Sequence, residues 1–96
     1  MRIIAKSALD TFAGKHPDSA AALFDWYHRM KKANYANRAE VRRDYPHADL
    51  VGVNRIFTCF NIKGNKYRLI VHLLYVTQTI YIRDVLTHAE YSKKYC

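Results

Sequence analysis

The segment spanning residues 60–69 constrains the fold of this chain more than any other, because its pattern specifies a tight β-hairpin. Gly64-Asn65 suits a two-residue turn, since glycine in the first position adopts the positive φ that the primed turn types require. Polar and apolar residues alternate on both sides of the turn. The resulting pairs are Lys63 with Lys66, Ile62 with Tyr67, Asn61 with Arg68, and Phe60 with Leu69. We therefore expect an antiparallel sheet built outward from this hairpin.

The hairpin belongs to a longer region, from about Val53 to Leu86, in which the hydrophobic period is two. Three runs rich in Val, Ile, Tyr and Phe predict an antiparallel meander. A second turn near Thr77-Gln78 gives the pairs Leu73 with Ile82 and His72 with Arg83. The apolar face then consists of Ile56, Phe60, Ile62, Tyr67, Leu69, Val71 and Leu73. The polar face consists of Arg55, Asn61, Arg68, His72, Tyr81 and Arg83. Asp84 falls on the apolar side, which indicates a bulge, an exposed strand end or an error in this register.

The first part of the chain supplies helices that can cover the apolar face. Residues 1–5 read as a short strand, and Ser7-Ala8-Leu9-Asp10 matches a capping box at the start of a helix that ends at about His16. Residues 17–19 interrupt this helix, and a second helix follows with one apolar stripe. The stripe consists of Leu23, Phe24, Tyr27 and Met30. Together the two segments predict a helical hairpin.

The rest of this part contains a tryptophan and a third helical segment. Trp26 lies beside the stripe, and its bulk favours packing in the core over a place at a partner interface. A short helical turn begins at Asn37, with Glu40 three residues on, and ends at Tyr45-Pro46. Residues 1–96 thus predict a single α+β domain in which a strand and a helical hairpin pack on a twisted antiparallel sheet.

Charge and cysteine usage bound the partners and the compartment. Sixteen Lys plus Arg against eight Asp plus Glu give a net charge of +8, which favours a polyanionic or acidic partner, with solubility alone as the alternative. Cys59 and Cys96 lie far apart and form neither a metal-type pair nor a disulfide framework, as expected in a reducing cytoplasm. The apolar stretch at the amino terminus is too short for a signal peptide or a membrane span. We expect a cytoplasmic protein without a membrane partner.

Several classes of catalytic site are absent from the sequence. It has no GxSxG elbow, P-loop or dinucleotide-binding glycine pattern, and its five histidines do not have metal-ligand spacings. We therefore prefer a mechanism without a metal or another cofactor. RNA permits one, because its own 2′-hydroxyl can attack the neighbouring phosphorus while the protein positions the strand, moves protons and neutralises charge.

Each residue that suits this chemistry also has a simpler interpretation. Arg68 could hold two phosphate oxygens, or be a solubilising charge on an exposed strand. His88 could act as acid or base for the 5′-oxygen, or only cap the turn that follows the third strand. Tyr91 could stack on a base or orient a phosphate, or simply pack. Lys63 and Lys66 could contact phosphate, or discourage aggregation at the sheet edge.

The same segments resemble the HigB toxin family of bacterial type II toxin–antitoxin systems, a branch of the RelE/ParE superfamily of small ribosome-associated mRNA interferases. The matching pieces are the early helix with Trp26, the block 60–70, Tyr81-Ile82-Arg83, and Thr87-His88-Ala89-Glu90-Tyr91. The resemblance implies a RelE-like α+β fold and cleavage of mRNA, usually in the ribosomal decoding site. It also implies neutralisation by a HigA-like helix-turn-helix antitoxin that represses the operon.

The resemblance carries active-site roles over to Arg68 and His88, with Tyr91 as a supporting catalytic candidate. The RNA-binding candidates are Lys63, Lys66 and Arg83, together with Arg55 from the predicted polar face. The chain departs from the family pattern at Ser92, where an aspartate is common, and at Asp84-Val85, where two apolar residues are more usual. Two alternatives stay open, a ParE-like topoisomerase poison on the same scaffold and a non-catalytic RNA-binding module.

Overall fold

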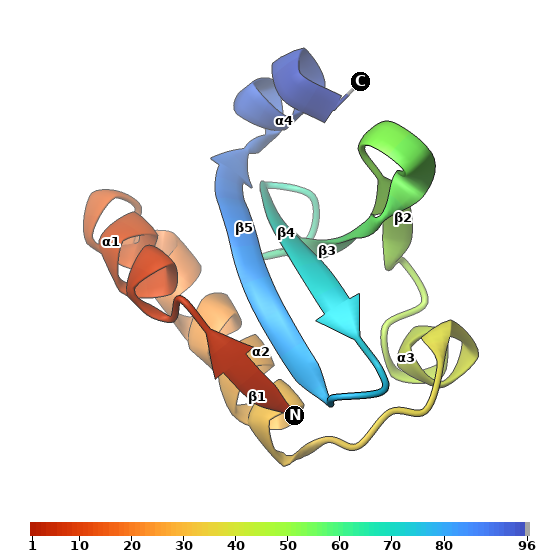
Figure 1. Cartoon of the computed structure of the whole chain (residues 1–96). Coiled ribbons are helices and arrows are strands. Elements are labelled where there is room, and N and C mark those ends of the chain that lie inside the picture. Colours follow the sequence, from red (N-terminus) through yellow and green to blue (C-terminus); the bar gives the residue numbers. More distant parts are fainter. Residues whose placement is uncertain (96) are drawn as a thin grey trace.

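The computed structural model describes residues 1–95, so Cys96 and any role of its thiol lie outside the described residues. Figure 1 shows the order of the helices and strands. The elements are β1 (Arg2–Ile4), α1 (Ser7–Lys15), the 3-10 turn η1 (Pro17–Ser19), α2 (Ala20–Lys32), α3 (Arg38–Asp44), β2 (Asp49–Val51), the 3-10 turn η2 (Val53–Arg55), β3 (Phe57–Ile62), β4 (Tyr67–Leu74), β5 (Thr79–Thr87) and α4 (His88–Tyr95).

The described strands form one five-stranded sheet with the order β1-β5-β4-β3-β2. Strands β2 to β5 pair as antiparallel neighbours, so the predicted meander is confirmed. The predicted amino-terminal strand is β1, which pairs with β5 in parallel at one edge. Strand β2 at the other edge was not predicted, because its three residues are too few to show a period.

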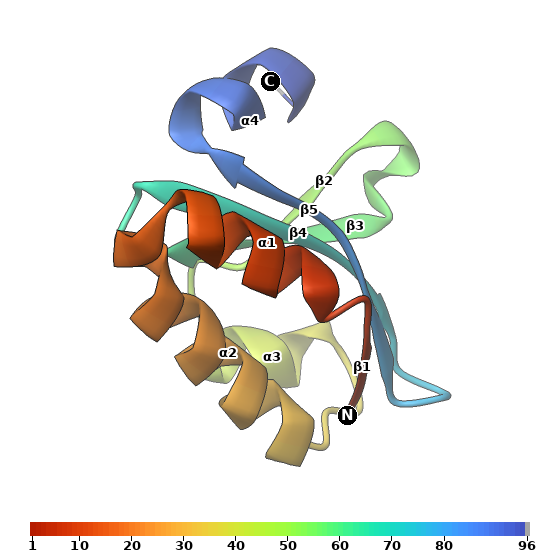
Figure 2. The same ribbon diagram turned by 90° about the vertical axis from the view of Figure 1, so that its left-hand side faces the viewer.

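The helices divide between the two faces of this sheet. Helices α1, α2 and α3 cover one face, and α4 lies on the opposite one (Figure 2). The core between the sheet and the three helices includes the fully buried side chains of Leu9, Leu23, Met30, Leu69 and Ile80. Each such side chain contributes roughly 1.5–3 kcal/mol. The predicted cover of the apolar face is confirmed, and we call the opposite side of the sheet the outer face.

Trp26 occupies the centre of this core, as its bulk predicted. Its side chain is only 2% exposed, and its ring meets the Phe60 ring edge-on with the centroids 5.5 Å apart. Phe24 and Tyr27, which the sequence placed in the apolar stripe, are only partly buried against the core. The stripe through which α2 packs is therefore centred on Trp26, which was predicted to lie beside that stripe.

The β3–β4 hairpin has the predicted register. Asn61 pairs with Arg68, and Ile62 with Tyr67. The Lys66 amide donates to the Lys63 carbonyl at 3.2 Å and closes a turn of residues 63–66. Gly64 has φ +66° as predicted, but Lys63 also has a positive φ of +53°, so both lysines belong to the turn rather than to the paired strands. We call residues 63–66 the hairpin turn.

The register predicted for the β4–β5 hairpin was wrong by two residues. The structure pairs His72 with Tyr81 in place of Arg83. The cause is the connection of residues 75–78, in which Gln78 closes the turn with φ +53°. A shift of two residues keeps side chains on their faces, so the sorting of the two faces survived the error from Thr79 to Ile82 of β5.

A bulge explains the misfit of Asp84. The register of β4 against β5 shifts between Ile70 and Val71, which pair with Asp84 and Ile82. Arg83 is therefore the extra residue of β5, and the alternation of its strand reverses there. Asp84 lies on the outer face in consequence, and not on the apolar side.

The start of the predicted meander was also wrong. Arg55 was placed on a strand, but it lies in η2 with φ +53°, outside the sheet, and Ile56 is 49% exposed instead of covered. The reason is Gly52, whose φ of +85° turns the chain, and where a Cβ atom would lie 2.8 Å from the Phe57 ring. Strand β3 can begin only after this turn, at Phe57.

The predicted capping box at the start of α1 does not form. Lys6 takes the N-cap position without a side-chain hydrogen bond to the helix amides, and Asp10 pairs with the Lys6 ammonium group at 3.3 Å. Aspartate is one methylene shorter than the glutamate that such a box requires. The predicted cap of α3 is confirmed, because the Asn37 side chain accepts from the Glu40 amide at 3.1 Å.

Candidate functional site

The outer face carries Arg68 near the hairpin turn. Its position on β4 lies between Asn61 of β3 and Leu86 of β5. The Arg68 Nη1 atom donates to the Asn65 carbonyl at 3.1 Å, and its guanidinium carbon lies 5.3 Å from the centre of the Tyr91 ring in α4. A cation over an aromatic face is attracted to it. Arg68 is thus held between the hairpin turn and α4.

Helix α4 begins beside the same turn. The His88 amide donates to the Lys66 carbonyl at 3.2 Å. Thr87 and Glu90 form a capping box, in which Thr87 Oγ1 accepts from the Glu90 amide at 3.2 Å and Glu90 Oε1 accepts from the Thr87 amide at 2.9 Å. These bonds hold the pKa of Glu90 below its ordinary value. The His88 side chain is exposed at this helix start.

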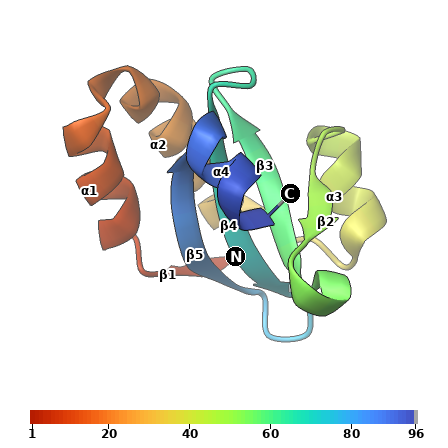
Figure 3. The same cartoon turned by 90° about the horizontal axis from the view of Figure 1, so that it is seen from above.

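The far end of α4 is attached to the outer face through Asp84. The Asp84 carboxylate accepts from Tyr95 Oη at 2.6 Å and pairs with Lys94 Nζ at 3.0 Å. Burial, and then the bond to Asp84, raise the pKa of Tyr95 to about 12. No side chain from His88 to Tyr95 is buried. Figure 3 shows α4 lying over the sheet, where it contacts β4 and β5. Polar and aromatic contacts therefore hold this helix, and not a share of the core.

The two lysines of the hairpin turn are engaged with a carboxylate of η1. Lys63 Nζ lies 3.3 Å from Asp18 Oδ2, Lys66 Nζ donates to the same oxygen, and Tyr67 Oη donates to Asp18 Oδ1 at 2.6 Å. Lys66 and Tyr67 hold the pKa of the Asp18 carboxyl far below its usual range. The Asp18 carboxylate raises the pKa of Lys66 and of Tyr67.

The other two cationic candidates lie apart from the hairpin turn. Arg83 projects from the β5 bulge, and its guanidinium carbon lies 5.1 Å from the centre of the Phe57 ring. Phe57 also meets His72 edge-on, with the ring centroids 5.9 Å apart. Arg55 lies in η2, ahead of β3. The structure therefore gathers Arg68, His88 and Tyr91 around the hairpin turn, with Arg83 further along the outer face and Arg55 beyond the sheet.

A polar hollow next to Arg68 was missed by the sequence reasoning. It has a volume of about 430 Å³ and is lined by His47, Asn61, Gly64 and Asn65. The Asn61 side-chain amide donates to Asn65 Oδ1 at 3.3 Å. Asn61 could have been suspected, because it pairs with Arg68. His47 could not, because it comes from the loop between α3 and β2 and no spacing connects it with the hairpin.

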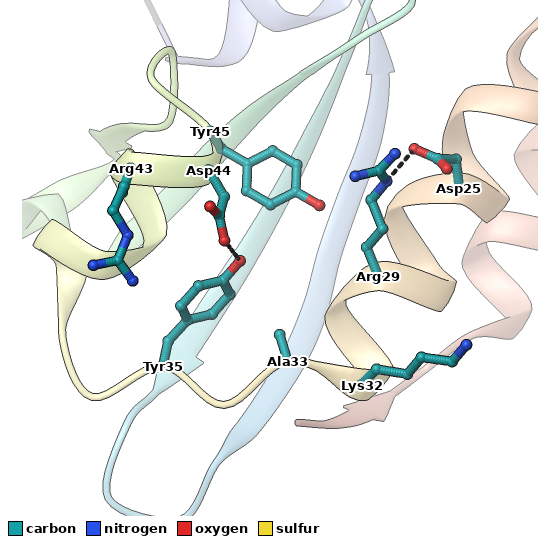
Figure 4. A pocket seen from close by; sticks show the side chains of 8 residues that line it. All are labelled: Asp25, Arg29, Lys32, Ala33, Tyr35, Arg43, Asp44 and Tyr45. Atoms are coloured by element: carbon teal, nitrogen blue, oxygen red, sulfur yellow. Dashed lines mark hydrogen bonds and ion pairs between the residues drawn. The ribbon is translucent and has the colours of Figure 1, made fainter.

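A second hollow, of about 670 Å³, opens between α2 and α3 (Figure 4). Its lining consists of Asp25, Arg29, Lys32, Ala33, Tyr35, Arg43, Asp44 and Tyr45. Four of these side chains pair with one another, Arg29 with Asp25 at 2.9 Å and Tyr35 with Asp44 at 2.7 Å. The hollow lies in the helical layer, away from α4, so it is not part of the candidate site.

Among residues 1–95, no three His, Cys, Asp or Glu side chains are grouped so that they could ligate a metal ion. No helix in that part of the chain combines the length and the apolar content that crossing a bilayer demands.

Comparison with known proteins gives consistent matches. A family model, HigB_toxin, described as the RelE-like toxic component of a toxin–antitoxin system, matches residues 19–94. The mRNA interferase HigB of Escherichia coli O6:H1 is 28% identical over 93 residues, which are 97% of this chain and 90% of that protein. The mRNA interferase toxin HigB of Escherichia coli K12 is 28% identical over 91 residues, 95% of this chain and 88% of that protein. The range 19–94 contains the whole β3–β4 hairpin and nearly all of α4.

Proposed function

The chain belongs to the HigB toxin family, whose model matches residues 19–94, and we propose from this that it is the toxin of a type II toxin–antitoxin pair and cleaves mRNA without a metal ion. Two relatives of nearly the same length are named mRNA interferases. The observation that carries the proposal is the meeting of Arg68 and the start of α4 at the hairpin turn, since each binds a carbonyl of that turn.

In the proposed reaction the ribose 2′-oxygen bonds to the adjacent phosphorus while the bond from phosphorus to the 5′-oxygen breaks. The 2′-hydroxyl gives up its proton to a base, and the leaving 5′-oxygen takes a proton from an acid. The products are a 2′,3′-cyclic phosphate and a free 5′-hydroxyl. The nucleophile comes from the RNA, so the protein has to position the strand, transfer protons and stabilise charge.

Arg68 has the charge-stabilising role in this scheme. A planar guanidinium carries a positive charge and can bind two phosphate oxygens at once. The Asn65 carbonyl and the Tyr91 ring restrict where the guanidinium can lie. A group held before substrate binds loses less freedom in the transition state, and this favours the reaction.

His88 is the proton-transfer candidate. An imidazole titrates near neutrality and can serve as the acid for the 5′-oxygen. Its side chain is exposed at the first position of α4, where RNA can reach it. Tyr91, one turn further along α4, lies against the Arg68 guanidinium and stacks on Tyr95 with the ring centroids 5.7 Å apart, so its proposed role is to hold Arg68 in place.

The cations of the outer face and the hairpin turn supply affinity rather than chemistry. Arg83 and Arg55 are exposed, and the net charge of +8 attracts a polyanion. Lys63 and Lys66 could join them by exchanging Asp18 for phosphate. We further propose mRNA on the ribosome as the substrate, a HigA-like helix-turn-helix antitoxin as the neutralising partner, and the cytoplasm as the location. The family description, the toxic component of a toxin–antitoxin system, supports the antitoxin.

The test combines toxicity on induction with cleavage in a purified system. Arg68→Ala and His88→Ala should each abolish growth arrest, and should each stop cleavage of a defined message incubated with ribosomes, as mapped by primer extension. Arg42→Ala is the matched control, because Arg42 is an exposed arginine of α3 bonded only to the Pro46 carbonyl among the contacts described. Full toxicity of both site variants would end the assignment. Arrest of DNA synthesis rather than of translation would favour a topoisomerase poison, and binding without cleavage a silent RNA-binding module.

A further inference from the structure

We infer that Asp18 is a positioning residue for the RNA-cleaving site, because its carboxylate fixes the hairpin turn to which Arg68 and α4 are attached. The inference rests on the proposed function. Asp18 lies in η1, which connects α1 with α2, and these two helices lie on the side of the sheet opposite α4 (Figure 2). It touches neither Arg68 nor His88 in the contacts described above, so it acts through the hairpin turn.

Asp18 holds the hairpin through hydrogen bonds and ion pairs. Its two carboxylate oxygens bind three side chains, those of Lys63, Lys66 and Tyr67. These partners lie 45 to 49 positions away in the chain, so the contacts join the helical layer to the sheet. The Tyr67 ring is itself 3% exposed and packs edge-on against Phe12 with the centroids 5.3 Å apart. One of the three partners of Asp18, Tyr67, is therefore part of the core.

The residues on both sides of Asp18 hold η1 in place. Pro17 precedes it and fixes its own φ. Ser19 follows it, is fully buried, and donates through Oγ to the His16 carbonyl at 2.7 Å. The His16 ring stacks on Phe12 with the centroids 4.5 Å apart. Asp18 is thus held from both sides, and the turn it binds takes its position from the helical layer.

The hairpin turn needs a negative charge between its two lysines. Lys63 and Lys66 face each other across the hairpin turn, and two ammonium groups this close repel. Lys63 also has a φ of +53°, which is unfavourable for a residue other than glycine. A single carboxylate between the lysines neutralises the repulsion and favours the strained turn.

The hairpin turn in its place positions two groups of the outer face, Arg68 and the start of α4. The Asn65 carbonyl accepts from Arg68, and the Lys66 carbonyl accepts from the His88 amide. Both acceptors are backbone groups of the turn that Asp18 holds. If the turn moves, Arg68 and the first residue of α4 move with it, and a displacement of about 1 Å can reduce the rate of an enzyme by up to about a hundredfold.

Asp18→Asn tests the inference, because asparagine keeps the size and an acceptor for Tyr67 but loses the charge. With purified protein and a defined RNA, we expect kcat to fall about tenfold and KM to stay within about twofold, as for a misplaced catalytic group. Asp25→Asn is the control. It removes the same charge from an exposed pair with Arg29 in the helical layer, and should leave both constants unchanged. Asp18→Glu, which restores the carboxylate, should recover most of kcat.

Two measurements keep the test decisive if Asp18→Asn folds poorly. Tyr67→Phe removes one contact without changing charge, and should lower kcat by about two- to threefold at constant KM, since a hydrogen bond to a charged group is modest in net strength. Exchange of the His88 amide hydrogen should quicken in both variants.

An unchanged kcat in both variants would overturn the inference. So would a lower KM with unchanged kcat in Asp18→Asn, because Asp18 would then be only a competitor of RNA phosphate for the lysines. If the wild-type protein itself does not cleave RNA, the proposed function fails, and the exchange of the His88 amide still reports whether Asp18 positions α4.

Discussion

Replacing Thr87 by alanine would show how firmly α4 is held over the outer face. Alanine removes the hydroxyl that accepts from the Glu90 amide at 3.2 Å, and leaves the glutamate to bond the Thr87 amide alone. Loss of a threonine N-cap costs about 1 kcal/mol. That free energy corresponds to an increase of about fivefold in the fraction of molecules in which α4 is frayed.

The effect should be local, since α4 buries no side chain. Fraying breaks the His88 amide bond to Lys66 and the contact of Arg68 with Tyr91, but it leaves the core between the sheet and helices α1, α2 and α3 covered. Segments that contribute little buried apolar area open without global unfolding. We therefore expect Thr87→Ala to leave the thermal midpoint nearly unchanged while the α4 amides exchange about fivefold faster. RNA cleavage should weaken in the same variant.

Amide hydrogen exchange followed by NMR measures both parts of this expectation residue by residue. Asn37→Ala is the matched control, because Asn37 caps α3 with the same kind of bond to Glu40 at 3.1 Å. Helix α3 buries Val41 and belongs to the helical layer, so this variant should lower global stability and leave α4 protected. Equal acceleration of exchange in α4 and in the core helices of Thr87→Ala would refute the view that α4 is held by polar and aromatic contacts without a share of the core.

Two further predictions follow from the same contacts. The capping bonds depress the pKa of Glu90, so its carboxylate stabilises α4 above its ordinary pKa near 4.5, and this contribution is lost as the pH falls through the lowered value in the folded protein. The protection of the α4 amides, corrected for the intrinsic exchange rate at each pH, should therefore fall below about pH 4.5 in the wild type and change less in Thr87→Ala. Trp26→Ala should reduce the free energy of unfolding by about 3–5 kcal/mol in urea titrations, whereas Tyr81→Ala, at a residue 44% exposed on the outer face, should change it by less than about 0.5 kcal/mol.

The sheet was predictable where a local signal set both the period and the turn. Gly64 supplied such a signal, and the register from Phe60 to Leu69 was correct. The β4–β5 connection carries no glycine, and Gln78 takes a positive φ that its residue type does not indicate. The bulge at Arg83 likewise depends on how two strands fit together. The sequence indicated it only indirectly, because the regular alternation put Asp84 on the apolar face.

The candidate site was predictable to a similar degree. The residues of the hairpin and of α4 could be found because each block has a pattern of its own, and Thr87 with Glu90 matches a capping box in the sequence itself. The contacts of Asp18 have no such pattern, because their partners lie more than forty positions away and meet it only when the helical layer packs on the sheet.

The parts of the fold that resisted prediction are also those that hold α4. Its first residue is attached to the hairpin turn, which Asp18 fixes from the helical layer. Its last turn is attached to Asp84, which reaches the outer face only because β5 has a bulge. Both attachments are made through hydrogen bonds and ion pairs, so the two can weaken while the core stays intact. In this fold the arrangement of Arg68, His88 and Tyr91 is therefore set by a few polar and aromatic contacts, and a variant can lose the candidate site while it keeps the fold.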